Sequence, residues 1–245
     1  MNPPDRLFIL GVRVDRITFD QTLSCIEDFI AAGGPHQIVT VNPEFVMAAQ
    51  AEPEFRRIIN RAALALPDGV GVCWAGRRLG QPLPERVPGV ELVERLAALS
   101  ARKGYRIYFL GAQPGVAERA AARLAARHAG MHVAGTHAGS PETCDDAGSL
   151  ARIRAGGPHI LLVAYGAPAQ DYWIDRNMAR LGVPVCIGVG GTFDYLAGVR
   201  PLAPRWLRRC GLEWLYRLIT QPWRWRRMLA LPRFAWRVSR STPYE

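Results

Sequence analysis

The sequence predicts an α/β protein with a Rossmann-like, mostly parallel sheet flanked by helices. Strand-like apolar runs alternate along the chain with segments of helical length. The runs are continuously apolar, which is typical of strands covered on both faces. Charge is uneven, because residues 200–245 hold eleven arginines and two acidic residues and so carry nine of the ten net positive charges. We therefore expect an α/β core over 1–199 and a helical, basic, Trp-rich appendage over 200–245.

The first elements follow from apolar periodicity and from proline and glycine positions. Asp20 is a suitable N-cap for one helix, and Asn42 with Pro43 suits the start of the next, which Pro53 is expected to break. The predicted order is a hairpin or edge strand over 7–14, a helix over 20–32, a strand over 37–41, a helix over 43–63 and a strand over 64–66.

The remaining core elements follow from the same signals. Continuous apolar runs predict buried strands, and the polar segment 136–148 is expected to be a loop. The predicted order is a short helix over 71–75, a helix over 90–102, a strand over 106–111, a helix ending near 128, a strand over 131–135, a strand over 160–164, a helix ending near 181 and a strand over 184–189.

Composition restricts the class of protein. Of the 245 residues, 49% are hydrophobic and 21% are charged, which is typical of a globular chain. The first residues lack the charged and apolar regions of a signal peptide, and no apolar run reaches the length of a membrane-spanning helix. We therefore expect a cytoplasmic protein. The five cysteines are scattered without a C-x-x-C pair, which argues against a zinc site or a disulfide framework.

Polar residues and glycine turns gather where the predicted strands end. Ligands of parallel sheets bind at the carboxyl ends of the strands, so these signals should meet at one edge. Thr40 and Asn42 alternate on one strand end and therefore point to the same side. The residues expected at this edge are Thr40, Asn42, Asp68, Gly111, Gly166, Gln170, Gly190 and Asp194.

Asp68 lies in a Pro-Asp-Gly turn directly after a strand and has two interpretations. The local sequence alone favours an Asx-turn, in which the side chain bonds its own backbone. A carboxylate on a tight turn at a strand end is also held rigidly and can face a cleft. The other signals at the same edge favour this second interpretation.

The other signals are ambiguous when taken singly. The glycine turns at 111–115 and 188–191 suit either phosphate contact or tight packing, and neither is a full G-x-G-x-x-G loop. Asn42 and Gln170 occupy positions where helix capping is the default role. Asp194 suits either a cap or a contact to a ribose hydroxyl or a base N–H.

The sequence has no Asp-x-Asp motif, no Walker loop and no evident Ser-His-Asp or Cys-His spacing. A carboxylate pair that holds a divalent metal under a nucleotide diphosphate is therefore not expected. An enzyme that handles such a diphosphate without a metal would use arginines instead. We expect neither a metal nor another cofactor.

Several spaced motifs together resemble the WecG/TagA/CpsF glycosyltransferases, glycosyltransferase family 26. The resemblance runs from about residue 7 to about residue 230. The motifs are T-V-N-P-E at 40–44, P-D-G-V-G at 67–71, E-R-V-P-G at 85–89, F-L-G-A-Q-P-G-V-A-E at 109–118, Y-G-A-P-A-Q-D-Y-W-I at 165–174, I-G-V-G-G-T-F-D at 187–194, A-P-R-W at 203–206 and G-L-E-W-L-Y-R at 211–217.

The resemblance implies an inverting, metal-independent glycosyltransferase of cell-surface polysaccharide synthesis. The implied donor is a UDP-sugar of the N-acetylmannosamine, N-acetylmannosaminuronate or glucose type, and the implied acceptor is a saccharide on a polyprenyl diphosphate. The implied roles are Asp68 as general base, Thr40, Asn42, Arg86 and Gln170 around the sugars, Asp194 near the nucleotide with Gly111 and Gly190 in substrate-binding turns, and Arg217, Arg224 and Arg227 near the diphosphates.

One motif departs from the family pattern. The family usually has G-x-P-K-Q-E where this chain has Gly166-Ala167-Pro168-Ala169-Gln170-Asp171. The lysine is lost and the acidic side chain is one carbon shorter. Gln170 is kept, and the identity of the transferred sugar is left open.

The appendage combines arginine with five of the seven tryptophans. Leu212, Leu215, Tyr216 and Ile219 form an apolar stripe at helical spacing, which Pro222 interrupts. The mixture suits a membrane–water interface, so we expect peripheral docking on the inner face of the cell membrane. The alternatives are an amphipathic helix packed on the core, a non-catalytic nucleotide- or lipid-binding module, and a nucleic-acid-binding tail. We do not expect nucleic acid as a partner, and a homo-oligomer is left open.

Overall fold

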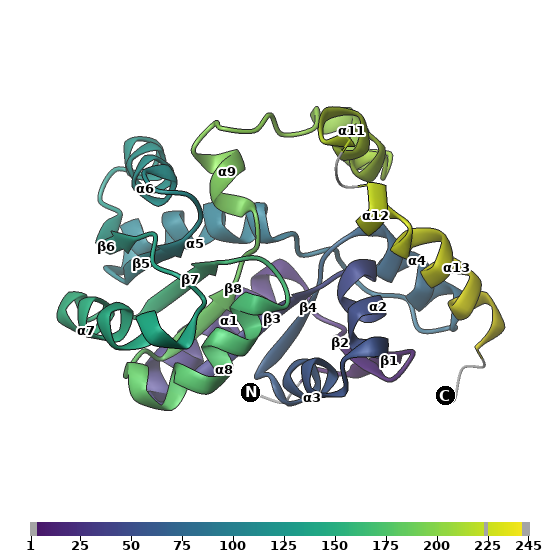
Figure 1. Ribbon diagram of the computed structural model, residues 1–245, viewed down its shortest axis with the longest axis horizontal. Helices are drawn as coiled ribbons and strands as arrows, with labels where there is room; N and C mark the ends of the chain where they lie inside the picture. Colours follow the sequence, from purple (N-terminus) through teal and green to yellow (C-terminus); the bar gives the residue numbers. More distant parts are fainter. Residues whose placement is uncertain (1–3, 223–224, 242–245) are drawn as a thin grey trace.

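The computed structural model describes residues 4–222 and 225–241 and confirms the predicted α/β class. Its main sheet has six strands in the order β4-β3-β8-β7-β5-β6, and each neighbouring pair is parallel. Helices cover both faces of this sheet (Figure 1). The carboxyl ends of all these strands therefore lie at one edge.

The predicted hairpin opens the chain, and the first helices and strands follow in the expected order. The elements up to the middle of the chain are β1 (Arg6–Ile9), β2 (Val12–Asp15), α1 (Phe19–Ala32), β3 (His36–Val41), α2 (Pro43–Ala51), α3 (Pro53–Arg61), β4 (Leu64–Pro67), α4 (Val70–Arg78) and α5 (Gly89–Lys103).

The second half completes the sheet and then leaves it. Its elements are β5 (Arg106–Gly111), α6 (Val116–Arg127), β6 (His132–His137), the 3₁₀ turn η1 (Thr143–Asp145), α7 (Asp146–Gly156), β7 (Ile160–Ala164), α8 (Ala169–Leu181), β8 (Val185–Gly188), α9 (Thr192–Leu196), α10 (Arg205–Arg209), α11 (Glu213–Thr220), α12 (Trp225–Met228) and α13 (Ala230–Arg240).

Alternate residues of each strand face opposite layers of helices. Ile38 of β3 packs in a core with α1, α5, α6 and α9 on one face of the sheet. Val39 faces the other way, into a core with the β1–β2 hairpin, α2, α3 and α4. A third core lies between β5, β7 and β8 and the helices α7 and α8. The continuous apolar runs in the sequence arise because both faces of the strands are buried.

Proline and capping residues place the helix ends at α2 and α3 as predicted. The Asn42 side chain accepts a hydrogen bond from the Phe45 N–H at 3.1 Å, and Pro43 is the first residue of α2. The chain then breaks at Glu52, before Pro53 starts α3. The capping interpretation of Asn42 is therefore confirmed, and it fixes where β3 turns toward the carboxyl edge of the sheet.

Three sequence predictions about helices were wrong. Thr18 caps α1 in place of Asp20, because Thr18 and Gln21 form a reciprocal capping box. The segment 136–148, expected to be a loop, includes the end of β6 and the start of α7. Helix α4 extends to Arg78 and does not end at residue 75.

The C-terminal helices pack back onto the core. Helix α13 lies against α2 and α4 (Figure 1). Its residues Phe234 and Val238 are buried in the same hydrophobic core as Val46. Within the part of the chain that the structure describes, no helix has the length and apolar character needed to cross a membrane.

Candidate active site

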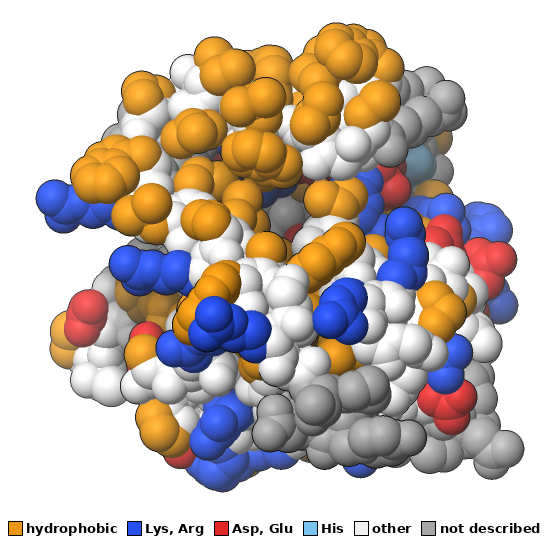
Figure 2. Space-filling model, turned by 90° about the vertical axis from the view of Figure 1, so that its right-hand side faces the viewer, with side chains coloured by type: hydrophobic (Ala, Val, Ile, Leu, Met, Phe, Trp, Pro, Cys, Tyr) orange, Lys and Arg blue, Asp and Glu red, His pale blue; other side chains and the backbone are white. Residues whose placement is uncertain are grey.

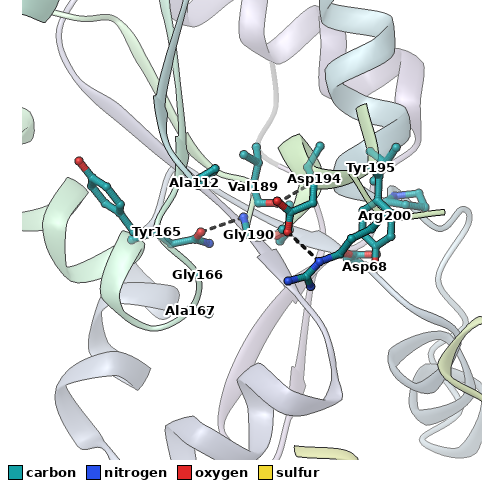
Figure 3. Close-up of a pocket in the computed structure, with 18 of the residues that line it drawn as sticks. Asp68, Ala112, Tyr165, Gly166, Ala167, Val189, Gly190, Asp194, Tyr195 and Arg200 are labelled. Carbon is teal, nitrogen blue, oxygen red and sulfur yellow. Dashed lines mark hydrogen bonds and ion pairs between the residues drawn. The ribbon is translucent and has the colours of Figure 1, made fainter. Parts of the chain in front are cut away.

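A cavity of about 720 Å³ lies at the carboxyl edge of the sheet. Residues that follow β3, β4, β5, β7 and β8 line its floor, and α9 with the C-terminal helices lines the other side. In Figure 3, Tyr165 and Asp68 lie on opposite sides of the turn at Gly190. The strand ends therefore meet in one cavity, as the sequence predicted.

The cavity brings together most of the predicted site residues. Gly111 does not line it, although the next residue, Ala112, does. A Cβ atom at Gly111 would lie 2.8 Å from the backbone of Ala164, so this glycine permits close packing of β5 on β7. Arg224 lies outside the described residues. The predicted residues that line the cavity are Thr40, Asn42, Asp68, Arg86, Gly166, Gln170, Gly190, Asp194, Arg217 and Arg227.

Asp68 follows β4 directly, and its backbone N–H donates to the Val41 carbonyl at 2.8 Å. Burial raises the pKa of its carboxyl group to about 6, and the nearby Glu213 acts in the same direction. The guanidinium groups of Arg217 and Arg86 and the backbone N–H of Gly89 act in the opposite direction. A carboxylate with such a pKa is ionised at neutral pH and retains proton affinity, which suits a general base.

Thr40 and Asn42 point toward the cavity from the end of β3. The Thr40 hydroxyl donates to the Gly188 carbonyl at 3.3 Å, which ties β3 to the end of β8. Asn42 lines the cavity while it caps α2. The capping role and a substrate-facing position are therefore compatible in this residue.

Gln170 connects two loops of the cavity floor. Its side-chain oxygen accepts a hydrogen bond from the Gly190 N–H at 2.8 Å (Figure 3). Gln170 therefore holds the glycine turn after β8 and does not cap its own helix, which was the default interpretation. Gly190 has φ = 55°, a conformation that favours glycine.

Asp194 lies in the first turn of α9 and pairs with Arg200 at 3.2 Å (Figure 3). Arg200 also donates to the Gln221 side chain at 3.0 Å. Arg200 was not predicted as a site residue, because one of its partners, Gln221, lies 21 residues further along the chain, directly after α11. Its position shortly after the I-G-V-G-G-T-F-D motif was the available signal.

Acidic residues of the cavity wall hold the arginines of the C-terminal helices. Arg208 pairs with Glu91 at 2.9 Å. Arg227 pairs with Glu44 at 2.6 Å. Both pairs link the C-terminal helices to the start of an earlier helix, α5 for Glu91 and α2 for Glu44. Cavity residues that were not predicted from the sequence include Glu44, Glu91, Arg119, Tyr165, Tyr195, Arg200, Arg208 and Glu213.

A second, smaller cavity of about 100 Å³ meets the first at Asp68. It shares Asn42, Arg86 and Glu213 with the large cavity. Its apolar wall comes from the core residue Val70 and from the appendage residues Trp214, Met228 and Leu231. Asp68 is therefore reached from two sides, one polar and one partly apolar.

Metal-ligating side chains are not gathered in this cavity. Among the described residues, no group of three or more His, Cys, Asp or Glu side chains is arranged to hold a metal ion. The positive charge around the cavity comes from arginines. Such a site can bind a diphosphate through charge-assisted hydrogen bonds.

Comparison with known protein families gives one match over nearly the whole chain. The model described as "Glycosyl transferase WecG/TagA/CpsF family" matches residues 7–244. This match includes the strand-end motifs and the C-terminal helices alike.

Relatives in three bacteria carry the name N-acetylglucosaminyldiphosphoundecaprenol N-acetyl-beta-D-mannosaminyltransferase. The Staphylococcus aureus protein is 32% identical over 235 residues, which covers 95% of this chain and 92% of the relative. The Bacillus spizizenii protein is 34% identical over 197 residues, which covers 80% of this chain and 76% of the relative. The Bacillus subtilis protein is 33% identical over 198 residues, with 81% and 77% covered.

Proposed function

The chain belongs to the WecG/TagA/CpsF family of glycosyl transferases, and we propose that it moves an N-acetylmannosamine-type sugar from UDP to a saccharide on a polyprenyl diphosphate. The names of the relatives support both the sugar and the lipid carrier. The observation that carries the proposal is the position of Asp68 where the two cavities meet.

The large cavity suits the nucleotide-sugar donor. Its volume of about 720 Å³ is within the range of pockets that hold ligands of this size. We place the nucleoside near Asp194 and the glycine turn at Gly190, with the sugar toward Thr40 and Gln170. The arginines of the cavity then surround the diphosphate.

The small cavity suits the acceptor. Its apolar wall continues into exposed side chains of the C-terminal helices, and Figure 2 shows hydrophobic side chains gathered at the top of that face, where Figure 1 places α11. The exposed large hydrophobic residues of these helices are Trp206, Leu212, Trp214, Leu215, Ile219, Trp225, Leu229 and Trp236. We propose that this surface docks peripherally on the inner face of the cell membrane, next to the lipid-linked acceptor.

In the proposed reaction the acceptor hydroxyl oxygen bonds to the anomeric carbon of the donor. Asp68 takes the hydroxyl proton as the bond between that carbon and the diphosphate oxygen breaks. Attack opposite the leaving group inverts the anomeric centre. Arg217 and Arg227 stabilise the charge that develops on the leaving diphosphate, which is the function that a metal has in other transferases, while Arg86 lies toward the sugars.

We also propose that residues 1–199 form the catalytic core and residues 200–245 an appendage that completes the active site. The ion pairs Glu44–Arg227 and Glu91–Arg208 support the proposal that the appendage completes the site, because each joins an acidic residue of the core to an arginine of the appendage. The exposed tryptophans of the appendage support its role at the membrane.

A panel of UDP-sugars, incubated with a synthetic lipid-diphosphate N-acetylglucosamine, tests the proposal. We expect disaccharide formation with UDP-N-acetylmannosamine and inversion at its anomeric centre. Product formation only with another sugar would contradict the donor assignment, and UDP binding without any transfer would favour a binding module. Liposome sedimentation beside a single-stranded DNA shift assay distinguishes the membrane from nucleic acid as the partner of the appendage.

A further inference from the structure

Glu213 is an acidic residue of the site that pairs with two arginines, Arg86 and Arg217. It is the first residue of α11, and its side chain is 19% exposed. It lines both the large and the small cavity, as Asp68 does. The proposed transfer assigns no step to this carboxylate, which lies where a negatively charged substrate must enter.

The Glu213 carboxylate joins two arginines from different parts of the chain. One of its oxygens is 3.7 Å from Nη1 of Arg86, which belongs to the core loop before α5. The other accepts a hydrogen bond from Nη2 of Arg217, one turn further along α11. The Arg217 guanidinium also lies 5.2 Å from the ring centroid of Tyr195 in α9. Glu213 therefore forms ion pairs with both guanidinium groups.

The same three side chains surround Asp68. Arg86 and Arg217 favour its ionised form, and the like charge of Glu213 disfavours it. The other groups that face Asp68 are the Gly89 N–H and the Cys73 thiol of α4. Without Glu213, only burial would oppose the effect of the two guanidinium groups on the pKa of Asp68.

We propose that Glu213 is a positioning residue for sugar transfer, whose carboxylate aligns Arg86 of the core with Arg217 of the appendage beside Asp68 and offsets their charge there. The inference rests on the proposed function, in which Asp68 is the general base. It gives the first helix turn of α11 a role in the chemistry, because the appendage then supplies both a cation for the substrate and the anion that balances it.

Glu213→Gln tests this role through the pH profile of kcat/KM. The substitution keeps the shape of the side chain and removes its charge, so Asp68 should lose its proton more readily. We expect the acidic limb of the profile to move to lower pH by about half a unit or more, because solvent screens part of the charge of this partly exposed group. Turnover above the limb should fall, because a weaker base removes the hydroxyl proton less effectively.

Glu91→Gln is the matched control. Glu91 also lines the large cavity and also pairs with an appendage arginine, Arg208, but it is not among the charges that act on Asp68. We expect the acidic limb of this variant to stay at the wild-type pH. Glu213→Asp keeps the charge and should keep the limb as well, even if turnover falls.

The inference is overturned if folded Glu213→Gln has its acidic limb of kcat/KM at the same pH as wild type. It is also overturned if Glu213→Asp moves this limb to lower pH as far as Glu213→Gln does. A ¹³C NMR titration of the Asp68 carboxyl group in the full chain provides a readout that needs no substrate. Should Asp68→Asn retain full activity, the base assignment fails, while the titration still shows whether Glu213 acts on Asp68. The two failures are therefore distinguishable.

Discussion

The buried carboxyl group of Asp171 lies against Gly188, where a Cβ atom would stand 2.9 Å from Oδ1 of Asp171. The Asp171 side chain has no exposed surface, and neither oxygen has a hydrogen-bond partner of normal geometry among the described residues. Burial raises the pKa of this group to about 7, against a smaller opposing effect of the Gln170 amide. Gly188 is required because Gln170 and Asp171 occupy the space of a side chain.

Asp171 should make the folded protein less stable as the pH rises. Its folded pKa of about 7 lies above the value of about 4 for an exposed aspartate, so the folded state binds the proton more tightly. Its contribution to stability is full below pH about 4 and is lost as the pH rises through about 7. Asp171→Asn should remove this loss, and the wild-type free energy of unfolding should decline relative to the variant by about 1–3 kcal/mol.

Asp146 provides the control with the opposite sign. Burial disfavours its charge, but hydrogen bonds from Arg176, two of them at 2.9 Å, outweigh burial and lower its pKa. Its stabilisation is present above the unfolded pKa and lost as the pH falls, so Asp146→Asn should be least stable relative to wild type at neutral pH. Urea unfolding of both variants between about pH 3 and 8 measures the differences, because Asp146 titrates at the acidic end of this range and Asp171 from about pH 4 to about 7. Parallel pH dependence of the two variants would contradict the assignment.

Local signals were sufficient to predict much of the fold and part of the site. The cap at Asn42, the break at Pro53 and the strand-end position of Asp68 depend on adjacent residues, so the sequence predicts them. Helix α7 was missed because it buries only a few apolar residues and contains Gly148. The glycine and the polar residues of its first turn resemble a loop.

The roles of Glu213 and Arg200 depend on contacts between segments that are far apart in the chain. They were therefore not predictable from local sequence. Arg200 meets Gln221 only because the chain folds back over the cavity after α9. Glu213 contacts Arg86 for the same reason. The motif that contains Glu213 indicated a helix in the appendage, and only the three-dimensional arrangement places its carboxylate beside Asp68.

Replacing the proposed base should abolish most of the transfer. Asp68→Asn preserves the size of the side chain but cannot take up the acceptor proton, so we expect turnover to fall by about 10²-fold or more. Asp20→Asn is the control for loss of one aspartate charge, because the Asp20 side chain is 94% exposed on α1. Initial rates with the same donor and acceptor measure the effect. Near-native turnover in a folded Asp68→Asn protein would rule out Asp68 as the base.

The rate of transfer should rise with pH through the ionisation of Asp68. Its pKa is raised to about 6 by burial, and the reaction needs the ionised carboxylate, so kcat/KM should increase from about pH 5 and level off above about pH 7. In Asp68→Asn, the residual kcat/KM should no longer show this acidic limb, the rise between about pH 5 and 7. A limb that persists in that variant would show that another group controls the profile.

Transfer should continue when divalent metals are removed. The chain has no Asp-x-Asp motif, and arginines surround the main cavity. Rates measured in excess EDTA should equal those in buffer with added Mg²⁺ or Mn²⁺. If chelation stops the reaction and Mn²⁺ restores it, the arginines do not replace a metal.

The appendage should contribute to chemistry and to membrane binding through different residues. Arg227 lines the main cavity and pairs with Glu44, while Trp225 and Trp236 are 53% and 57% exposed and line neither the large nor the small cavity. Arg227→Ala should slow transfer by about tenfold, the effect of losing about 1.4 kcal/mol of transition-state stabilisation, with little loss of liposome binding.

The pair Trp225→Ser and Trp236→Ser should weaken liposome binding and leave transfer to a short-chain, water-soluble acceptor unchanged. Deleting residues 200–245 is a poorer experiment, because it uncovers the core that Phe234 and Val238 fill. If Arg227→Ala uses the soluble acceptor as fast as wild type, Arg227 takes no part in transfer and the appendage acts through it only as an anchor.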